Sequence, residues 1–440
     1  MAYDYIFDNL YILSLPPQAN QTIDVNVNAN LPNFLGRGGI PNVPANTSSS
    51  VADAREATAA YIFDQEVPYS LTWTLSIQRQ LKQNWSVEFR YLGTRGIHLL
   101  TQNRLNVRAP VQPGHSLPTF LTRPSQASLD ALPLTLNSLT NESFFVPSFE
   151  AAGFTGNFVV AFPSNGNSTY HGASAQLIRR FADGVQMTAA YTWSHLIDDT
   201  TAEVNSTVLS PRRVQDFQNL TPERADSALD RRHRFVLSGL YELPWLRNHP
   251  NKLVRTILGG FNFAGTYTAE SGEKATVLSG TDSNLNLDAA PDRTIRNPAG
   301  VRNTASTVTA LRNTAGQVVG YLADNPNAEY IRAGQGALPN SARNTLQLPG
   351  INNVDLSIFK NFRFGEGAKK IQLRADFFNA FNHPQYIPGS VNDVAAVSTT
   401  GVGQVNTATA ANINNHLFND PSQIFASNAR VIQMALRFDF

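Results

Sequence analysis

The chain has no cysteine, few charged residues and no long apolar run. Without cysteine it has neither a disulfide framework nor a thiolate metal site. Only 15% of its 440 residues are charged, against about 25% in a typical soluble domain. No stretch reaches the roughly 18 consecutive apolar residues of a membrane-spanning helix. The first residues, MAYDYIFDNL, lack the basic start and apolar run of a signal peptide.

The charges are also nearly balanced, with 34 Lys and Arg against 33 Asp and Glu. A nucleic-acid-binding protein needs a basic excess or a basic stripe, so we expect no nucleic-acid partner. None of the eight histidines stands at a metal-binding spacing. No nucleophile motif and no phosphate-binding glycine loop is present. We therefore expect no catalytic activity, no metal and no cofactor.

What the chain does have is aromatic residues and strand-like alternation, most clearly in its last segment, RVIQMALRFDF. Every second residue there is apolar: Ile432, Met434, Leu436, Phe438 and Phe440. Because successive side chains of a strand point to opposite faces, this segment has one apolar and one mostly small or polar face. We expect the apolar face to contact outer-membrane lipid. A final aromatic strand of this form is what the barrel-assembly machinery reads in outer-membrane proteins.

Eight other segments alternate in the same way, and they come in pairs. They are LTWTLSIQRQL with WSVEFRYL, HGASAQLIRRF with VQMTAAYTWS, HRFVLSGLYEL with GGFNFAGTYTAESG, and NVDLSIFKNF with KIQLRADFFNAF. Their polar faces carry charges that a protein core would exclude unless they were paired. These charged residues are Glu88, Arg90, Arg374 and Asp376, joined in the last segment by Arg437 and Asp439.

The connections alternate strictly between short and long. Those within pairs span roughly 3–15 residues and carry turn residues, as in Lys82-Gln83-Asn84 and Ala182-Asp183-Gly184. Those between pairs are long and polar, and we interpret them as structureless loops. They are Gly93–Thr169, His195–Arg232, Gly272–Asn352 and Pro384–Asn428. Within the third, the segment GQVVGYLA is a candidate hairpin. An antiparallel meander places all the short turns on one side and all the long loops on the other. In bacterial outer-membrane barrels the short turns are periplasmic and the long loops external, and we expect the same here. The sequence thus predicts an all-β, antiparallel transmembrane barrel wall of about ten or more strands.

Aromatic residues at the expected strand ends favour the same interpretation, because barrels carry aromatic girdles at both membrane interfaces. These residues are Trp85, Tyr91, Tyr191, Trp193, Tyr241, Trp245, Tyr267 and Phe440. The alternative is a soluble β-sandwich binding module in which they are ordinary core aromatics.

Four segments resemble the C-terminal barrel of Oar-like TonB-dependent outer-membrane transporters. They are PYSLTWTLSIQRQLKQNWSVEFRYLGTRGIHLL, STYHGASAQLIRRFADGVQMTAAYTWSHLIDD, DRRHRFVLSGLYELPW and IQLRADFFNAFNHPQY, in that order. The resemblance covers residues 68–440. It implies active transport across the outer membrane by a barrel of about 22 strands. In that family, TonB contacts a plug domain.

The chain departs from the family pattern, because we find no signal peptide, no TonB box and no plug domain in it. We therefore expect a C-terminal barrel fragment, with residues 1–67 as an external loop or lead-in segment and TonB acting only through the absent plug. The alternative is a self-contained small barrel that serves as a passive pore or a surface adhesin. The loops carry no readable ligand code, so the sequence does not indicate the substrate.

Two polar runs are candidate sites. In DRRHR, the residues Arg231, Arg232 and Arg234 could contact lipopolysaccharide phosphates or an anionic ligand. The alternative is local pairing with Glu223, Asp226 and Asp230. In DSNLNLDAAPDR, alternating oxygen side chains could bind Ca²⁺: Asp282, Asn284, Asn286, Asp288 and Asp292. Leu287 and Arg293 replace the glycine and glutamate of an EF-hand loop, which favours a hydrated polar loop instead.

Overall fold

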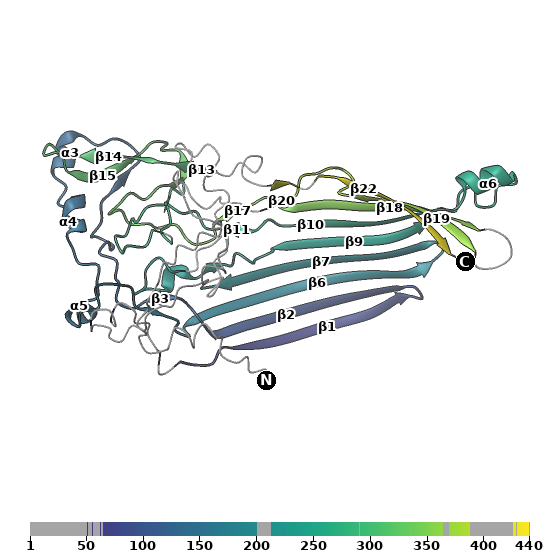
Figure 1. The fold of residues 1–440 in the computed structure, drawn as a ribbon, viewed down its shortest axis with the longest axis horizontal. Coiled ribbons are helices and arrows are strands. Elements are labelled where there is room, and N and C mark those ends of the chain that lie inside the picture. The colour runs from purple at the N-terminus through teal and green to yellow at the C-terminus, as the bar shows by residue number, and fades with distance from the viewer. Residues whose placement is uncertain are drawn as a thin grey trace, which may run out of the picture.

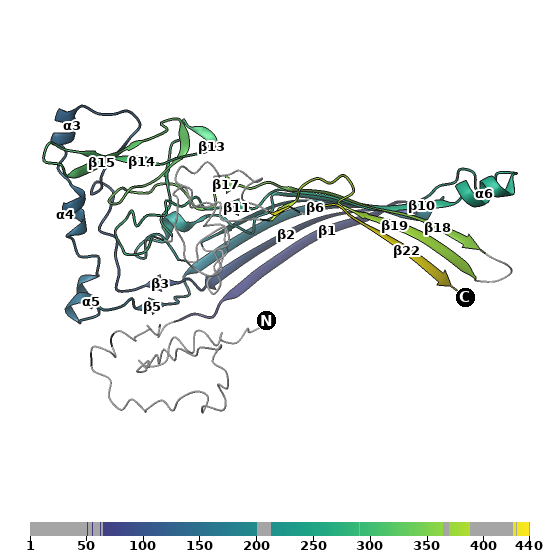
Figure 2. The same ribbon diagram turned by 45° about the horizontal axis from the view of Figure 1, so that its top comes forward.

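A computed structural model describes residues 65–199, 213–289, 291–363, 369–387, 426–427 and 429–439, together with positions 51, 55 and 62. One long antiparallel sheet dominates it, with most of the irregular chain gathered at one end of the strands (Figure 1). Seen from another side, the sheet is strongly twisted and curved (Figure 2). Such curvature is what a segment of barrel wall requires.

In the part of the chain that the structure describes, nine long strands follow one another in chain order, and every neighbouring pair is antiparallel. They are β1 (Tyr69–Lys82), β2 (Trp85–Leu99), β6 (Gly166–Ala182), β7 (Val185–Asp198), β9 (His233–Glu242), β10 (Phe261–Glu270), β18 (Ile351–Arg363), β19 (Lys370–Phe378) and β22 (Val431–Asp439). A short strand, β8 (Ala225–Asp226), pairs with β7. The predicted meander is confirmed. The sheet is open, since β1 and β22 each have one edge without a partner among the described residues.

The short connections follow from turn chemistry. Asp183 and Gly184 join β6 to β7 with φ angles of 52° and 78°. Two consecutive positive φ angles are typical of a type I′ hairpin turn, which favours Asp-Gly. The predicted turns after Lys82 and Ala182 are confirmed. The β9–β10 connection is longer than predicted and contains a helix, α6 (Lys252–Leu258).

In their described residues, the first three long connections are not structureless, and that part of the prediction is wrong. We call their described residues 100–165, 213–232 and 271–350 the cap. Its elements are α3 (Gln126–Asp130), α4 (Leu136–Thr140), α5 (Pro147–Ala151), η2 (Thr221–Glu223), β3 (Asn103–Arg104), β4 (Thr119–Phe120), β5 (Val160–Ala161), β11 (Lys274–Ala275), β12 (Ile295–Arg296), β13 (Val301–Ser306), β14 (Val308–Arg312), β15 (Val318–Ala323), β16 (Ala328–Ile331) and β17 (Leu346–Gln347). The candidate hairpin GQVVGYLA is confirmed as part of the β14–β15 pair.

Three predicted loop boundaries are also wrong. β2 continues to Leu99 and β6 begins at Gly166, so the first long connection is shorter than expected at both ends. β7 continues past His195 to Asp198, so the second begins later than expected. The ladder extends at these strand ends because they have partners, as where Gly96 pairs with Ser70 and Ser168. The fourth long connection contains β20 (Tyr386–Ile387), which pairs with β21 (Ala426–Ser427).

The hydrophobic core lies in the cap and not on the sheet. Among the described residues, every buried apolar side chain belongs to the cap. About half of them belong to three clusters, built around Leu117 and Leu139, around Val107 and Phe217, and around Leu311. A β-sandwich would bury apolar residues between two sheets. The soluble sandwich is therefore wrong, and the cap is a packed unit at one end of an exposed sheet (Figure 1).

Candidate functional site

One face of the sheet is an exposed apolar surface, which we call the apolar face. Cross-strand register aligns its side chains in rows, such as Ile77, Phe89, Ala175, Tyr191 and Phe235. Side chains of this size are normally buried in a soluble protein. Each long strand has at least nine residues, enough to cross a bilayer when tilted.

The last strand continues this surface as the sequence predicts. Ile432, Met434, Leu436 and Phe438 alternate onto the apolar face, and Met434 is 82% exposed. Phe440 lies outside the described residues. Recognition of this strand by the barrel-assembly machinery stays a prediction.

Two matching aromatic pairs lie on the apolar face near the cap. The Tyr91 hydroxyl is 2.7 Å from His171 Nδ1, and the Tyr191 hydroxyl is 2.8 Å from His233 Nδ1. In each pair the rings stack with centroids 6.2 Å apart. Aromatic side chains with a polar tip suit the interface between lipid and water, which places one membrane boundary at this level.

The opposite side of the sheet, the polar face, carries ion pairs. All six predicted charges of this face are paired: Arg90 with Glu88, Arg374 with Asp376, and Arg437 with Asp439. A hollow of about 350 Å³ lies across β7, β9, β10, β18 and β19, lined by Thr188, Ser238, Thr266, Asp355, Arg374 and Asp376 among others. Paired charges and hydroxyls suit a water-filled or polar interior.

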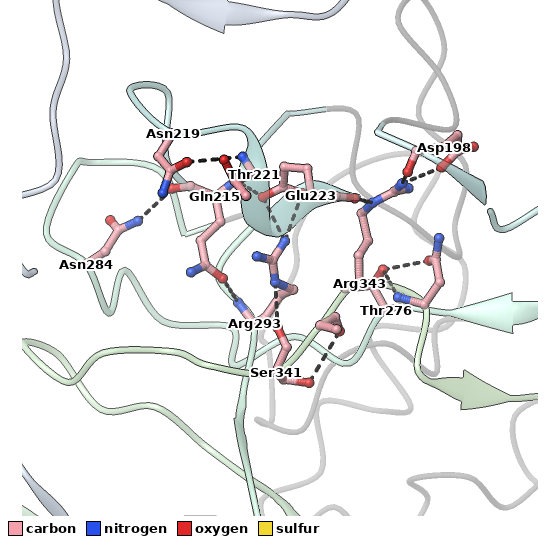
Figure 3. Close-up of polar contacts among 12 residues, drawn as sticks. Asp198, Gln215, Asn219, Thr221, Glu223, Thr276, Asn284, Arg293, Ser341 and Arg343 are labelled. Carbon is pink, nitrogen blue, oxygen red and sulfur yellow. Dashed lines mark hydrogen bonds and ion pairs between the residues drawn. The ribbon is translucent and has the colours of Figure 1, made fainter. Parts of the chain in front are cut away.

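A buried polar network holds the cap together (Figure 3). At its centre, Arg293 Nη1 donates to both carboxylate oxygens of Glu223 at 2.8 Å. Arg293 Nε also donates to the carbonyl of Ser341, at 2.9 Å. Gln215 accepts a hydrogen bond from the Arg293 amide and donates its own amide to Glu223. This arrangement joins the second and third long connections in a site with almost no solvent exposure.

The same network reaches the sheet through Arg343. Its Nη2 donates to the carbonyl and the carboxylate of Asp198, the last residue of β7. Its Nε donates to the Glu223 carbonyl at 3.0 Å. Arg343 therefore fixes the third connection to both the second connection and the end of the barrel wall. The side chains of Asp198, Glu223 and Arg343 are all buried, so removing one charged partner would leave another charge buried without compensation.

The predicted Ca²⁺ run lies in this packed region. Asp288, 4% exposed, accepts a two-point contact from Arg213, with Arg104 Nη1 3.4 Å away. Asp282 accepts backbone amides of its own loop. The expected hydrated loop is wrong, because this run is buried where three connections meet. In the part of the chain that the structure describes, no group of three or more His, Cys, Asp or Glu side chains is placed to hold an ion.

Asp292 is the most perturbed carboxyl in this run. Its Oδ2 accepts hydrogen bonds from the amide and hydroxyl of Ser283 and the amide of Asn284, while Oδ1 is buried without a partner. Burial raises the pKa of Asp292 from 3.8 to about 7, against the opposing effect of these hydrogen bonds.

This raised pKa predicts that the stability of the folded cap depends on pH. The folded cap holds the Asp292 proton more tightly than the unfolded chain, so this stabilisation is complete below the ordinary pKa. It is lost as the pH rises from 3.8 towards about 7. We expect hydrogen-exchange protection of the cap to fall over that range, and Asp292→Asn to flatten the profile. An unchanged profile in the variant would contradict this assignment.

The predicted arginine cluster is engaged in ion pairs. Arg231 contacts Glu270 and Glu273, and Arg232 contacts Asp226 and Asp230. Arg234 lies on the polar face, 3.4 Å from Glu270, with most of its side chain exposed. Local pairing is thus present for Asp226 and Asp230, whereas Glu223 pairs with Arg293. Contact of these arginines with lipopolysaccharide or an anionic ligand stays a prediction.

The comparison with known protein families leads to the same interpretation of the apolar face and the polar face. The family described as "Outer membrane beta barrel domain" matches residues 1–433. The chain belongs to this outer-membrane β-barrel family. The apolar face of the barrel therefore contacts outer-membrane lipid, and the polar face lines the interior. No helix among the described residues is long and apolar enough to span a membrane. No curated protein matches the chain in sequence.

Among solved structures, the outer-membrane transporter YddB from Escherichia coli is similar, with a TM-score of 0.36 and 10% identity over 86% of this chain and 33% of its own. The pyoverdine receptor FpvA from Pseudomonas aeruginosa PAO1 has a TM-score of 0.35 and 10% identity, over 88% of this chain and 31% of its own. The chain therefore spans about a third of the length of these barrel proteins.

Proposed function

We propose that the chain forms the C-terminal part of the barrel of a TonB-dependent outer-membrane transporter of the Oar-like kind. The observation that carries this proposal is an open antiparallel wall of nine long strands with a polar, ion-paired inner face. The sequence resemblance supports the transporter family. In this proposal the barrel moves a substrate across the outer membrane without catalysing a reaction, and TonB acts through a plug domain.

The odd number of long strands among the described residues supports membership of a larger barrel. β1 and β22 run in the same direction, because eight antiparallel steps separate them. Closing the wall on itself would pair them in parallel, whereas bacterial barrels contain an even number of antiparallel strands. An antiparallel closure needs an odd number of additional strands. This count argues against a passive pore or adhesin made from these nine strands alone.

The size of the gene product tests the proposal. An antibody against the cap should detect, in outer-membrane fractions of the producing cells, a protein much longer than 440 residues. Detection of a 440-residue product in those fractions would favour the self-contained barrel. In planar bilayers, the purified chain should give no steady conductance, which a passive pore would show.

A nutrient screen tests transport itself. A strain lacking this gene and a strain lacking TonB should lose uptake of the same nutrient. A screen over iron chelates, peptides and oligosaccharides would identify its class. Full uptake of every nutrient that requires TonB, in the strain lacking this gene, would contradict the proposal.

A further inference from the structure

The β9–β10 connection carries a helix at the end of the sheet opposite the cap. Figure 1 shows α6 projecting beyond the strand ends there. Asn251 caps the helix, because its side-chain oxygen accepts the amides of Leu253 and Val254. The turns after β1 and β6 take two residues each, whereas this connection runs from residue 243 to 260. A reversal of the chain therefore does not account for its length.

The helix is amphipathic and its apolar side is uncovered. At 3.6 residues per turn, Leu253, Val254, Ile257 and Leu258 share one side, and Lys252, Arg255 and Thr256 share the other. Leu253 is 70% exposed and Ile257 is 59% exposed. Trp245, just before the helix, is 69% exposed. Val254 is half-buried, so most but not all of the apolar side of the helix is exposed.

The charge of the connection has one sign. Residues 243–260 contain Arg247, Lys252 and Arg255 but no aspartate or glutamate. Of these, only Arg247 has a carboxylate partner among the described residues, Glu242 at 3.4 Å. An exposed apolar side beside uncompensated cations is typical of a helix that lies in the headgroup layer of a membrane.

A lysine fixes the end of the helix to the lipid side of the wall. Lys360 of β18 lies on the apolar face, in register with Phe261 of β10. Its ammonium donates to the carbonyls of Ile257 and Gly259, at the C-terminal end of α6. It also lies 4.7 Å and 5.1 Å from the ring centroids of Phe261 and Phe362. The helix is therefore continuous with the surface that contacts lipid.

We propose that α6 is an interfacial anchor in the periplasmic leaflet of the outer membrane. Leu253, Ile257 and Leu258 enter the boundary between headgroups and acyl chains, and Lys252 and Arg255 face phospholipid phosphates. The occupant of the apolar side is thus the lipid surface and not a periplasmic protein. This inference rests on the membrane location of the barrel and is independent of what the barrel transports.

Spin labelling tests this placement, since the chain has no cysteine of its own. Single cysteines replace Leu253, Thr256 and Leu356 in the full chain, which is then reconstituted in vesicles of phosphatidylethanolamine and phosphatidylglycerol. We expect nitroxides at 253 and 356 to be more accessible to oxygen than to a water-soluble nickel chelate. The label at 256, on the polar side of the helix, should show the reverse preference.

Each outcome decides the proposal. Equal access of the nickel chelate to 253 and 256, with 356 in lipid, would place the helix in water and leave its apolar side to a protein partner. Nickel access at 356 as well would overturn the membrane-embedded wall and the anchor with it. Lys360→Met should increase the mobility of the label at 253 several-fold. Unchanged mobility would overturn the role of Lys360.

Discussion

Arginine in place of Leu237 is expected to cost the barrel wall about 2–4 kcal/mol, the usual penalty for this side chain on a lipid-facing position near the bilayer centre. Leu237 lies in the middle of β9, on the apolar face, in register with Ala189 of β7 and Tyr267 of β10. Both neighbouring strands hold it in place, so the charge cannot escape by fraying of a sheet edge. Urea unfolding in vesicles measures the loss.

The matched control for Leu237→Arg is the adjacent residue. Ser238 points to the polar face and lines the hollow there. Ser238→Arg places the same charge on the same strand but away from lipid, so we expect a change within about 0.5 kcal/mol. Equal losses of unfolding free energy in the two variants would contradict this assignment, because they would mean that both faces of the sheet meet the same solvent.

The second large effect is expected from Arg343→Met. The substitution leaves the carboxylate of Asp198 buried without its cation and removes the hydrogen bond to the Glu223 carbonyl. Loss of one partner from a buried ion pair typically costs about 3–5 kcal/mol. Hydrogen-exchange protection of the cap should therefore fall by orders of magnitude, while protection of β9 and β10 stays unchanged.

Two further variants separate charge from packing. Arg123→Met removes an exposed arginine of the same cap and should leave protection nearly unchanged. Asp198→Asn combined with Arg343→Met removes the uncompensated buried charge and should restore part of the lost protection. A double variant as unstable as Arg343→Met alone would mean that the ion pair itself contributes little.

The barrel wall could be predicted from sequence because its pattern is local. Strands with one lipid-facing side alternate every second residue, as in VQMTAAYTWS, and no distant contact is needed to detect this. The contrast between two-residue turns and long connections then fixed the direction and order of the strands. The polar-face charges, such as Arg374 and Asp376, were predictable for the same reason.

The cap could not be predicted in this way. Its core residues, such as Leu117 and Tyr330, have no regular spacing, and the contact that fixes the cap to the barrel wall joins Asp198 to Arg343 across 145 residues. Burial of charged residues far apart in the chain leaves no local signal. Helix α6 did leave one, since Leu253, Ile257 and Leu258 recur at helical spacing. The helix has only seven residues, too few for that spacing to predict a helix by itself.

The central claim is that this sheet is a membrane wall with one side in lipid. The most direct test places single cysteines along β10, at each position from 262 to 268, and measures labelling of the vesicle-reconstituted chain by a water-soluble maleimide. If one side of the sheet lies in lipid, labelling should be strong at 262, 264, 266 and 268 and weak at 263, 265 and 267. Uniform labelling along the strand would contradict it.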